Sequence, residues 1–521
     1  MSDKKYICVK CIEKGEHKTK PIPSTEEMGE VCSVCNEKGL VIDYITKTKK
    51  KPKKKKKEDN KKYSSCIIDD ERETIAEQVY DGESKFCFYD SRKGEVKYYN
   101  SLWDVNDARK DYLPLDGEEV EKKAILLPTE AIEYGSEEEL DIQIKNFINK
   151  WLDVDEDYIQ FALWNIKRSW VYERFHTLNY LRALGDTGQG KSRFLDTLGY
   201  LHYKPIATSG ATTSAPIFRI INKWKGTLII DEADFAKSDE AQDIIKIINQ
   251  GYESGKHIMR CDKDDSNKVN FFDPYCPKIL ATRRTFTDKA VESRCITQVM
   301  KGTMRQDIPW NLNNSFWREA QEIRNKLLMW RFRNFFKIDG EKEIDIGMNN
   351  LEPRVKQIVS SFVNLFGGDD KQLEIFKEFI IKYQEDLIDE RQNSFAGQIV
   401  GAIHSLLENG IENISTQDII NEGEITDFKG NPAKPRSLSS TLRALGFEKA
   451  EQKKVDGKNK RCLPISKVLC ELLFKRYGYK NIENIGNEVT VVTQYMETPQ
   501  NKTKPKTSLD SIKVEKVREK G

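Results

Sequence analysis

Eight consecutive residues carry a pattern suited to binding phosphate, Gly-Asp-Thr-Gly-Gln-Gly-Lys-Ser at positions 185–192. Its glycines let backbone N–H groups turn inward around a phosphate, which also meets the N-terminus of a following helix. The pattern follows the apolar run 178–184 and precedes a helix-forming segment, and this strand, loop and helix order favours nucleotide binding over a chance match. We therefore expect ATP and Mg²⁺ to be bound by Gly185, Asp186, Thr187, Gly188, Gln189, Gly190, Lys191 and Ser192. Lys191 would neutralise the outer phosphates and Ser192 would hold Mg²⁺.

A second motif, made of two acidic residues, follows the apolar run 227–230, which is predicted to be a buried parallel strand. Asp231 would stand at the carboxyl end of this strand and hold the magnesium ion, and Glu232 would polarise the attacking water. Two acidic residues after a strand are by themselves a common turn signal. Together with the glycine loop they predict hydrolysis of the bound nucleotide.

Length and charge bound the remaining possibilities. A chain of 521 residues is expected to hold three or four folded units, and its net charge of +2 conceals local basic stretches. No apolar run is long enough to span a membrane and no export signal follows Met1, so the sequence predicts a cytoplasmic protein without membrane partners. The lysine-rich run described below would also serve as a nuclear-import signal, which leaves a nuclear location open.

Four of the eleven cysteines form two Cys-x-x-Cys pairs, Cys8 with Cys11 and Cys32 with Cys35. Their spacing predicts a four-thiolate Zn²⁺ ribbon over residues 1–45, with a redox-active dithiol pair or unpaired structural thiols as the alternatives. Such ribbons bind DNA, RNA or protein, so the role of this one stays open.

Eleven lysines lie between residues 46 and 62, and we interpret residues 46–65 as a linker that either contacts phosphate backbones or serves as a soluble spacer. Residues 66–150 read as a small α+β adaptor. It contains a hairpin around 90–94, whose aromatic residues are expected to pack in a core rather than stack on bases, and the first of two helices over 137–152 and 157–175.

A charged β-hairpin is predicted between a helix at 239–250 and a strand at 278–282. It carries Lys256, Arg260, Lys263 and Lys268, which would suit contacts to a DNA backbone in the pore of a ring. An ordinary solvated hairpin would look similar.

The order of these motifs, followed by Glu292-Ser293-Arg294, resembles the AAA+ ATPases over residues 150–365. The resemblance extends to the minichromosome-maintenance-like helicases and to related helicases of viruses and mobile elements. It implies an α/β P-loop core at 151–310, a helical lid and connector at 311–390, and a homo-oligomeric ring, most simply a hexamer. Thr282 would occupy the sensor 1 position, Arg354 would be a sensor 2 residue or a solvated helix arginine, and Arg294 would reach the γ-phosphate of a neighbour. Arg283 and Arg284 are alternatives for this arginine finger.

Three short helices and a basic hairpin around 456–461 predict a winged-helix domain at 391–480, with Arg436 and Arg443 on a candidate recognition helix. Such domains bind DNA or protein. Residues 481–521 are predicted to be a largely disordered tail.

These expectations combine into an ATP-dependent DNA helicase or translocase of DNA replication, with single-stranded or forked DNA and other replication proteins as partners. The alternatives are a helicase loader or remodelling ATPase, and an ATP-switched origin-binding or transcription factor that does not unwind DNA.

Overall fold

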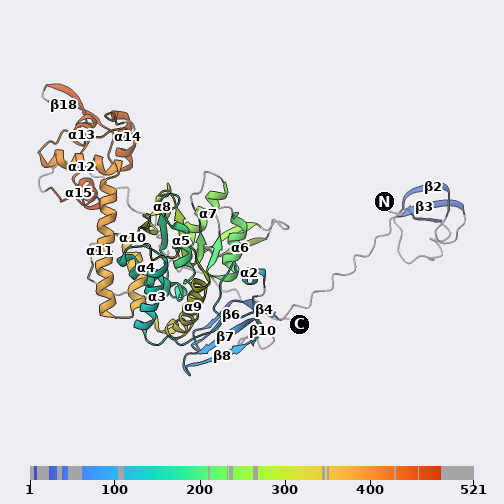
Figure 1. Ribbon diagram of the computed structural model, residues 1–521. Helices are drawn as coiled ribbons and strands as arrows, with labels where there is room; N and C mark the ends of the chain where they lie inside the picture. The colour runs from blue at the N-terminus through green and yellow to red at the C-terminus, as the bar shows by residue number, and fades with distance from the viewer. Residues whose placement is uncertain are drawn as a thin grey trace, which may run out of the picture. The chain divides into compact units, whose positions relative to one another are not determined.

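The chain divides into two compact units, Met1–Glu343 and Ile344–Gly521 (Figure 1). The computed structural model describes residues 61–103, 111–115, 117–208, 212–231, 233, 239–261, 268–342, 347–348, 351–427, 430–455 and 457–482, and the backbone of 5–8, 23–31 and 38–44.

The N-terminal segment forms a three-stranded antiparallel sheet in the order β1-β3-β2. Its strands are β1 (Lys5–Cys8), β2 (Pro23–Val31) and β3 (Lys38–Tyr44). Cys11, Cys32 and Cys35 lie outside the described residues, as does the side chain of Cys8, so the zinc prediction stays a prediction. Most of the predicted lysine linker also lies outside them.

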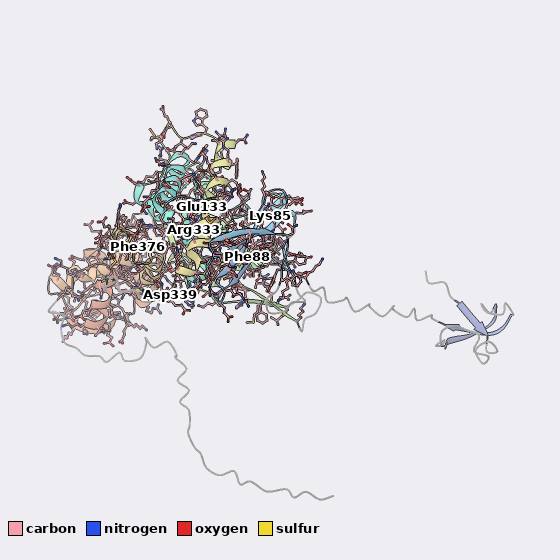
Figure 2. All side chains as sticks on the ribbon, turned by 90° about the horizontal axis from the view of Figure 1, so that it is seen from below. Lys85, Phe88, Glu133, Arg333, Asp339 and Phe376 are labelled. Carbon is pink, nitrogen blue, oxygen red and sulfur yellow. The ribbon has the colours of Figure 1, made fainter. Side chains whose placement is uncertain are left out.

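Two sheets follow, one entirely antiparallel and one mixed. A four-stranded antiparallel sheet has the order β5-β6-β7-β8, and a three-stranded sheet has the order β4-β10-β9. The predicted hairpin is confirmed, because β7 pairs with β8 and Asp90 opposes Glu95 beside the turn. Phe86 and Cys87 are buried in its core, while Lys85 and Phe88 mark this sheet in Figure 2. The strands are β4 (Lys61–Ser64), β5 (Cys66–Asp69), β6 (Thr74–Tyr80), β7 (Ser84–Asp90), β8 (Glu95–Tyr99), β9 (Leu102–Trp103) and β10 (Asp111–Pro114).

The centre of the first unit is a five-stranded, entirely parallel sheet in the order β12-β13-β16-β11-β17. Its strands are nearly continuous apolar runs, as expected for parallel strands covered on both faces. Helices α6 (Ser214–Trp224) and α7 (Asp239–Gln250) share one hydrophobic cluster with β13 and β16. Gly199 of helix α5 (Lys191–Gly199) lies against Ile229, whose side chain points to the other face of the sheet. The predicted α/β fold with a parallel sheet is thereby confirmed. The strands are β11 (Tyr180–Leu184), β12 (Ile206–Thr208), β13 (Leu228–Ile230), β16 (Lys278–Thr282) and β17 (Cys295–Val299).

The connections between these strands are helical, apart from a β-hairpin formed by β14 (Ile258–Cys261) and β15 (Val269–Phe272). The predicted helix at 239–250 and strand at 278–282 are both present at those bounds. The helices of the first unit are α2 (Glu118–Glu121), α3 (Glu137–Trp151), α4 (Glu156–Ser169), η1 (Tyr172–Arg174), α5 (Lys191–Gly199), α6 (Ser214–Trp224), α7 (Asp239–Gln250), α8 (Lys289–Glu292), α9 (Asn314–Asn334) and η2 (Phe335–Lys337).

Helix α9 belongs to the first unit, although the sequence placed it with the lid. Lys150 on α3 forms an ion pair with Glu319 of α9 at 2.7 Å. Arg333 of α9 donates to Glu133 at 2.7 Å, and the two residues lie together in Figure 2. The predicted lid and connector at 311–390 is therefore divided between the two units.

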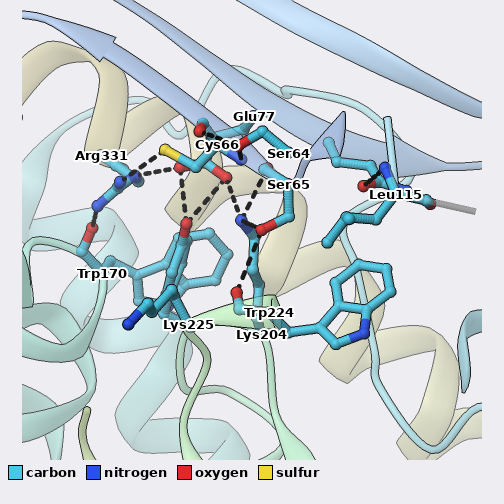
Figure 3. Close-up of polar contacts among 12 residues, drawn as sticks. Ser64, Ser65, Cys66, Glu77, Leu115, Trp170, Lys204, Trp224, Lys225 and Arg331 are labelled. Atoms are coloured by element: carbon cyan, nitrogen blue, oxygen red, sulfur yellow. Dashed lines mark hydrogen bonds and ion pairs between the residues drawn. The ribbon is translucent and has the colours of Figure 1, made fainter. Parts of the chain in front are cut away.

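A buried ionic cluster joins the antiparallel sheet to the parallel one (Figure 3). Glu77 of β6 is only 1% exposed and accepts from the Tyr203 hydroxyl, the Lys204 ammonium and Arg331 Nε of α9, each within 2.9 Å. Arg331 also pairs with Glu173 at 2.8 Å. A single carboxylate thus ties β6, the turn before β12 and α9 together.

The second unit is helical with one hairpin. The three predicted helices and the hairpin are present, and the Ser415 side chain caps the second helix by accepting from the Asp418 backbone N–H. Its last helix, α15, was not predicted. The elements are α10 (Pro353–Phe366), α11 (Asp370–Gln392), α12 (Phe395–Glu408), α13 (Thr416–Glu422), α14 (Pro435–Ala444), β18 (Glu451–Val455), β19 (Lys458–Cys462) and α15 (Lys467–Arg476).

Among the described residues, every helix is too short or too polar to cross a membrane.

Candidate nucleotide-binding site

The glycine loop connects the carboxyl end of β11 to the N-terminus of α5. Gly188 and Gly190 have φ angles of 83° and 85°, in the left-handed region that other residues rarely adopt. A Cβ atom at Gly188 would meet nothing within 4 Å, so the space beside this residue is open. Gly190 is the N-cap of the nine-residue α5, whose first N–H groups are left for a ligand. The loop therefore has the backbone form of a phosphate cradle.

Lys191 begins α5 and bends back over this loop. Its ammonium group donates to the carbonyl oxygen of Asp186 at 2.7 Å. Gln189 closes the loop from the other side, because its side-chain oxygen accepts from Asp186 N–H at 2.7 Å. The lysine ammonium is thus held at the mouth of the cradle, where phosphate oxygens would replace the carbonyl.

Ser192 and Asp231 meet although they lie on different elements. The Ser192 hydroxyl donates to Asp231 Oδ2 at 2.9 Å, across 39 residues of sequence. Asp231 directly follows β13, and Ser192 is the second residue of α5. The sheet therefore brings together the hydroxyl and the carboxylate that the sequence assigned to magnesium.

Thr282 ends β16, the strand between β11 and β13. It pairs in register with Leu184, and its carbonyl oxygen accepts from Gly185 N–H at 3.2 Å. The side chain is fully buried, and its hydroxyl has no hydrogen-bond partner in the part of the chain that the structure describes. A buried hydroxyl without a partner is costly, which marks Thr282 as a group positioned for a ligand or water beside the loop.

These residues fit ATP with Mg²⁺. The described residues contain no group of three His, Cys, Asp or Glu side chains that could hold a metal ion by itself. Mg²⁺ bound to a nucleotide needs no such cage, because phosphates and water supply most of its ligands. One hydroxyl from Ser192 and one carboxylate from Asp231 meet that requirement.

Asp196 adds a further carboxyl group on α5. Burial raises its pKa, a hydrogen bond from Tyr200 lowers it, and the nearby negative charge of Asp231 raises it again. A cation placed beside Asp231 would relieve this repulsion.

Two predicted catalytic residues, Glu232 and Arg294, and the alternatives to Arg294 need separate mention. Glu232 lies outside the described residues. Arg294 immediately precedes β17, and its carbonyl accepts from Tyr180 N–H at the start of β11. Its guanidinium stacks 5.1 Å from the Tyr252 ring centroid and donates to the carbonyl of Ala290. The five residues of β11 separate it from the glycine loop by roughly 16 Å, so it lies at the opposite edge of the sheet. The alternatives Arg283 and Arg284 are exposed directly after Thr282, at the same edge as the loop.

The basic residues of the hairpin do not form the free basic surface that the sequence predicted. Arg260 pairs with Asp243 of α7 at 2.7 Å and lies 4.1 Å from the Phe218 ring centroid, so it faces inward. Lys256 pairs with Glu253 at 2.5 Å, Lys268 is exposed, and Lys263 lies outside the described residues. Met259 and Phe271 oppose each other on the outer face, 65% and 60% exposed.

The remaining predicted contacts lie in the second unit. Arg354 is on the first turn of α10 and donates to Gln357 at 2.7 Å. Arg436 and Arg443 are exposed on α14, whose apolar side buries Leu438 and Leu442.

Sequence reasoning missed the segment that follows β17. Met300 N–H donates to the Leu184 carbonyl at 2.7 Å, and the Met300 carbonyl lies where a Cβ on Gly185 would approach to 3.0 Å. Arg193 of α5 holds the same segment through the carbonyls of Pro309 and Trp310, at 3.0 and 2.7 Å. An arginine directly after Lys191-Ser192 was the only local signal of this contact.

Comparison with known proteins gives weak likenesses. No family model matches the chain, and no curated protein matches its sequence. Among solved structures, the apo C-terminal region of NrS-1 aligns with 75% of this chain and 97% of its own, at 12% identity and a TM-score of 0.37. The SCCmec type IV Cch active helicase aligns with 82% of this chain and 74% of its own, at 11% identity and a TM-score of 0.36. The Thermotoga maritima RuvB Holliday junction branch migration motor covers 64% of this chain and 99% of its own, at 14% identity and a TM-score of 0.19. TM-scores below 0.5 do not establish a shared fold, so the assignment depends on the geometry of the chain's own residues.

Proposed function

We propose that this protein is an ATP-hydrolysing motor that translocates on DNA and separates its strands, acting as a ring in DNA replication. The observation that carries the hydrolase assignment is the 2.9 Å contact between Ser192 and Asp231 at the carboxyl edge of a parallel sheet, beside a left-handed glycine turn and Lys191. Ligands bind at this edge in open α/β sheets.

Each residue has a role in this proposal. Backbone N–H groups of the loop and of the first turn of α5 orient the phosphates, and Lys191 stabilises charge on the transferred phosphoryl group. Ser192 and Asp231 would hold Mg²⁺, which would supply positive charge to stabilise the phosphates during hydrolysis. Glu232 orients the attacking water, and Thr282 supplies a buried hydroxyl beside it.

The position of Arg294 supports the proposal of a ring. This guanidinium is partly exposed at the sheet edge opposite its own glycine loop, so it serves a nucleotide held by a second copy of the chain. Mixing Arg294→Ala with Lys191→Ala subunits tests this, because each retains the half that the other lacks. Hydrolysis above that of either variant alone supports a shared site, and simple dilution contradicts it.

DNA contacts are assigned to Lys256, Lys263 and Lys268 at the hairpin, and to Arg436 and Arg443 on α14. Arg260 is left out, because it faces Asp243 and the Phe218 ring. Support comes from the exposed arginines of α14 and from the strands β18 and β19, whose exposed residues include Lys454, Lys458 and Arg461. The proposal that this part of the chain is a winged helix is supported by the order of its elements, in which helices α12, α13 and α14 are followed by the hairpin of β18 and β19.

A fork-unwinding assay tests the motor. Displacement of a labelled strand should require ATP and disappear in Lys191→Ala. Hydrolysis and DNA binding without displacement would favour the second candidate, an ATP-switched DNA-binding factor or a helicase loader.

The zinc ribbon stays part of the proposal on the spacing of Cys8, Cys11, Cys32 and Cys35. Elemental analysis should find one zinc ion per chain and its loss in Cys32→Ser. Full zinc content in that variant would contradict the four-thiolate site.

A further inference from the structure

The segment 301–313, which crosses beside the glycine loop, has a fixed backbone and exposed apolar side chains. Met304 and Trp310 are each 93% exposed, more than any other large apolar side chain among the described residues. Single exposed apolar residues are common on protein surfaces. Here two of them lie within one short segment, and the backbone that carries them is tied down.

Three side chains from other elements hold this segment. Thr303 donates to Asp153 at 2.6 Å, and Arg305 donates to Asn149 at 2.8 Å while pairing with Asp307 at 2.6 Å. Arg193 binds the carbonyls of Pro309 and Trp310. The segment is therefore organised before any partner arrives, which lowers the entropy lost on binding.

The location of the segment identifies the partner. Met300, directly before the segment, donates its N–H to the carbonyl of Leu184, the residue before Gly185, and Arg193 is the residue after Ser192. The tethered segment thus adjoins the glycine loop at the edge of the sheet where an arginine from a second copy has to arrive. A surface that surrounds a shared nucleotide site must be covered by that copy.

We propose that Trp310 and Met304 are the anchors by which a second copy of this chain docks over the glycine loop. Tryptophan and methionine are enriched in the buried centres of such interfaces, and a few residues of this kind supply most of the binding energy. This inference rests on the proposed function, because it takes Arg294 to act on a neighbour's nucleotide.

The experiment introduces Trp310→Ala into one member of the complementing mixture at a time. In the parent mixture, the Arg294→Ala chain supplies the working glycine loop and the Lys191→Ala chain supplies Arg294. Trp310→Ala on the Arg294→Ala chain removes the anchor beside the working loop, and recovered hydrolysis should fall about tenfold or more. The same change on the Lys191→Ala chain removes an anchor beside a dead loop, and should cost less than twofold.

Trp103→Ala is the matched control, because Trp103 is also an exposed tryptophan, at 71%, but lies on β9. It should leave the recovered hydrolysis and the self-association unchanged. Thermal unfolding of Trp310→Ala should match the wild type, since so exposed a side chain contributes little to the folded core.

Equal effects on both chains, or no effect, would overturn the proposal. A loss that saturating ATP restores, with self-association by sedimentation velocity unchanged, would assign Trp310 to the nucleobase and would also overturn it. If the parent mixture shows no recovery, the shared site itself fails. Sedimentation of wild type, Trp310→Ala and Trp103→Ala with ATP then decides, because only weaker association of Trp310→Ala supports the docking surface.

Discussion

Two polar clusters in the first unit assemble side chains from distant parts of the chain, and they differ in how completely their groups are satisfied. In the Glu77 cluster every charge is paired: the buried Lys204 and Arg331 lie around the buried Glu77 carboxylate, and the partly exposed Glu173 also pairs with Arg331. At the glycine loop Ser192 is exposed, Lys191 reaches only a carbonyl of its own loop, and the buried Thr282 hydroxyl has no described partner.

The difference separates structure from function. A buried cluster whose members satisfy one another fixes the relative position of elements and leaves nothing for a ligand. A cluster with open backbone N–H groups, an accessible cation and a hydroxyl without a described partner has groups that can bind a ligand. We therefore expect substitutions in the first cluster to change stability and substitutions in the second to change chemistry.

The largest effect is expected for Glu77→Gln. It leaves Lys204 and Arg331 buried without their carboxylate, and breaking such a pair costs about 3–5 kcal/mol. Denaturant unfolding measures this loss, while hydrolysis per folded molecule should stay near the wild-type value. Lys85→Met is the control, because its pair with Asp81 is at the surface and such pairs contribute at most about 1 kcal/mol. Equal destabilisation by both variants would contradict the structural role.

Lys191→Ala should reverse this pattern. Loss of a preorganised charge at the phosphoryl group lowers the hydrolysis rate about 10²–10³-fold. The melting temperature should hardly change, because Lys191 donates only to its own loop. A large drop in melting temperature would show that Lys191 stabilises the fold. Hydrolysis within a few-fold of wild type would contradict its role at the phosphoryl group.

His202 lies on the turn after α5 and provides a pH test of a buried polar group outside both clusters. Its ring contacts the Leu198 carbonyl at 2.8 Å and Asn165 at 3.2 Å, and burial lowers its pKa from 6.5 to about 4. Between these values the unfolded chain binds a proton that the fold excludes, so stability falls as the pH drops from 6.5 to about 4.

The expected contribution of this histidine over that interval is about 3 kcal/mol. It appears as a steeper acid dependence of unfolding in the wild type than in His202→Gln. Identical slopes would show that the ring is protonated in the fold.

Thr282→Val should have the smallest effect of these substitutions, and it separates a role in hydrolysis from a role in packing. Removing a buried hydroxyl that has no partner among the described residues should leave stability unchanged or raise it by about 1 kcal/mol. If the hydroxyl serves the reacting phosphate, hydrolysis falls about tenfold, equivalent to 1.4 kcal/mol in the barrier. Unchanged hydrolysis would assign Thr282 to packing alone.

How far sequence could predict these two clusters follows from their construction. The glycine loop and the strand before Asp231 are local patterns, so their types and spacing suffice. No local sequence pattern marks Glu77, Lys204 and Arg331, because they come into contact only when three elements distant in the sequence pack together. Helix α9 reads as amphipathic wherever it docks, which is why its sequence did not assign it to the first unit. Arg260 was predicted to contact DNA because the sequence does not show its ion pair with Asp243, which forms only in the folded chain.

Calorimetric titration of the full chain with ATP and Mg²⁺ tests the central claim most directly. The account predicts one nucleotide bound per chain, lost in Lys191→Ala and retained in Lys85→Met. No binding by the wild-type chain, or equal binding by Lys191→Ala, would contradict it.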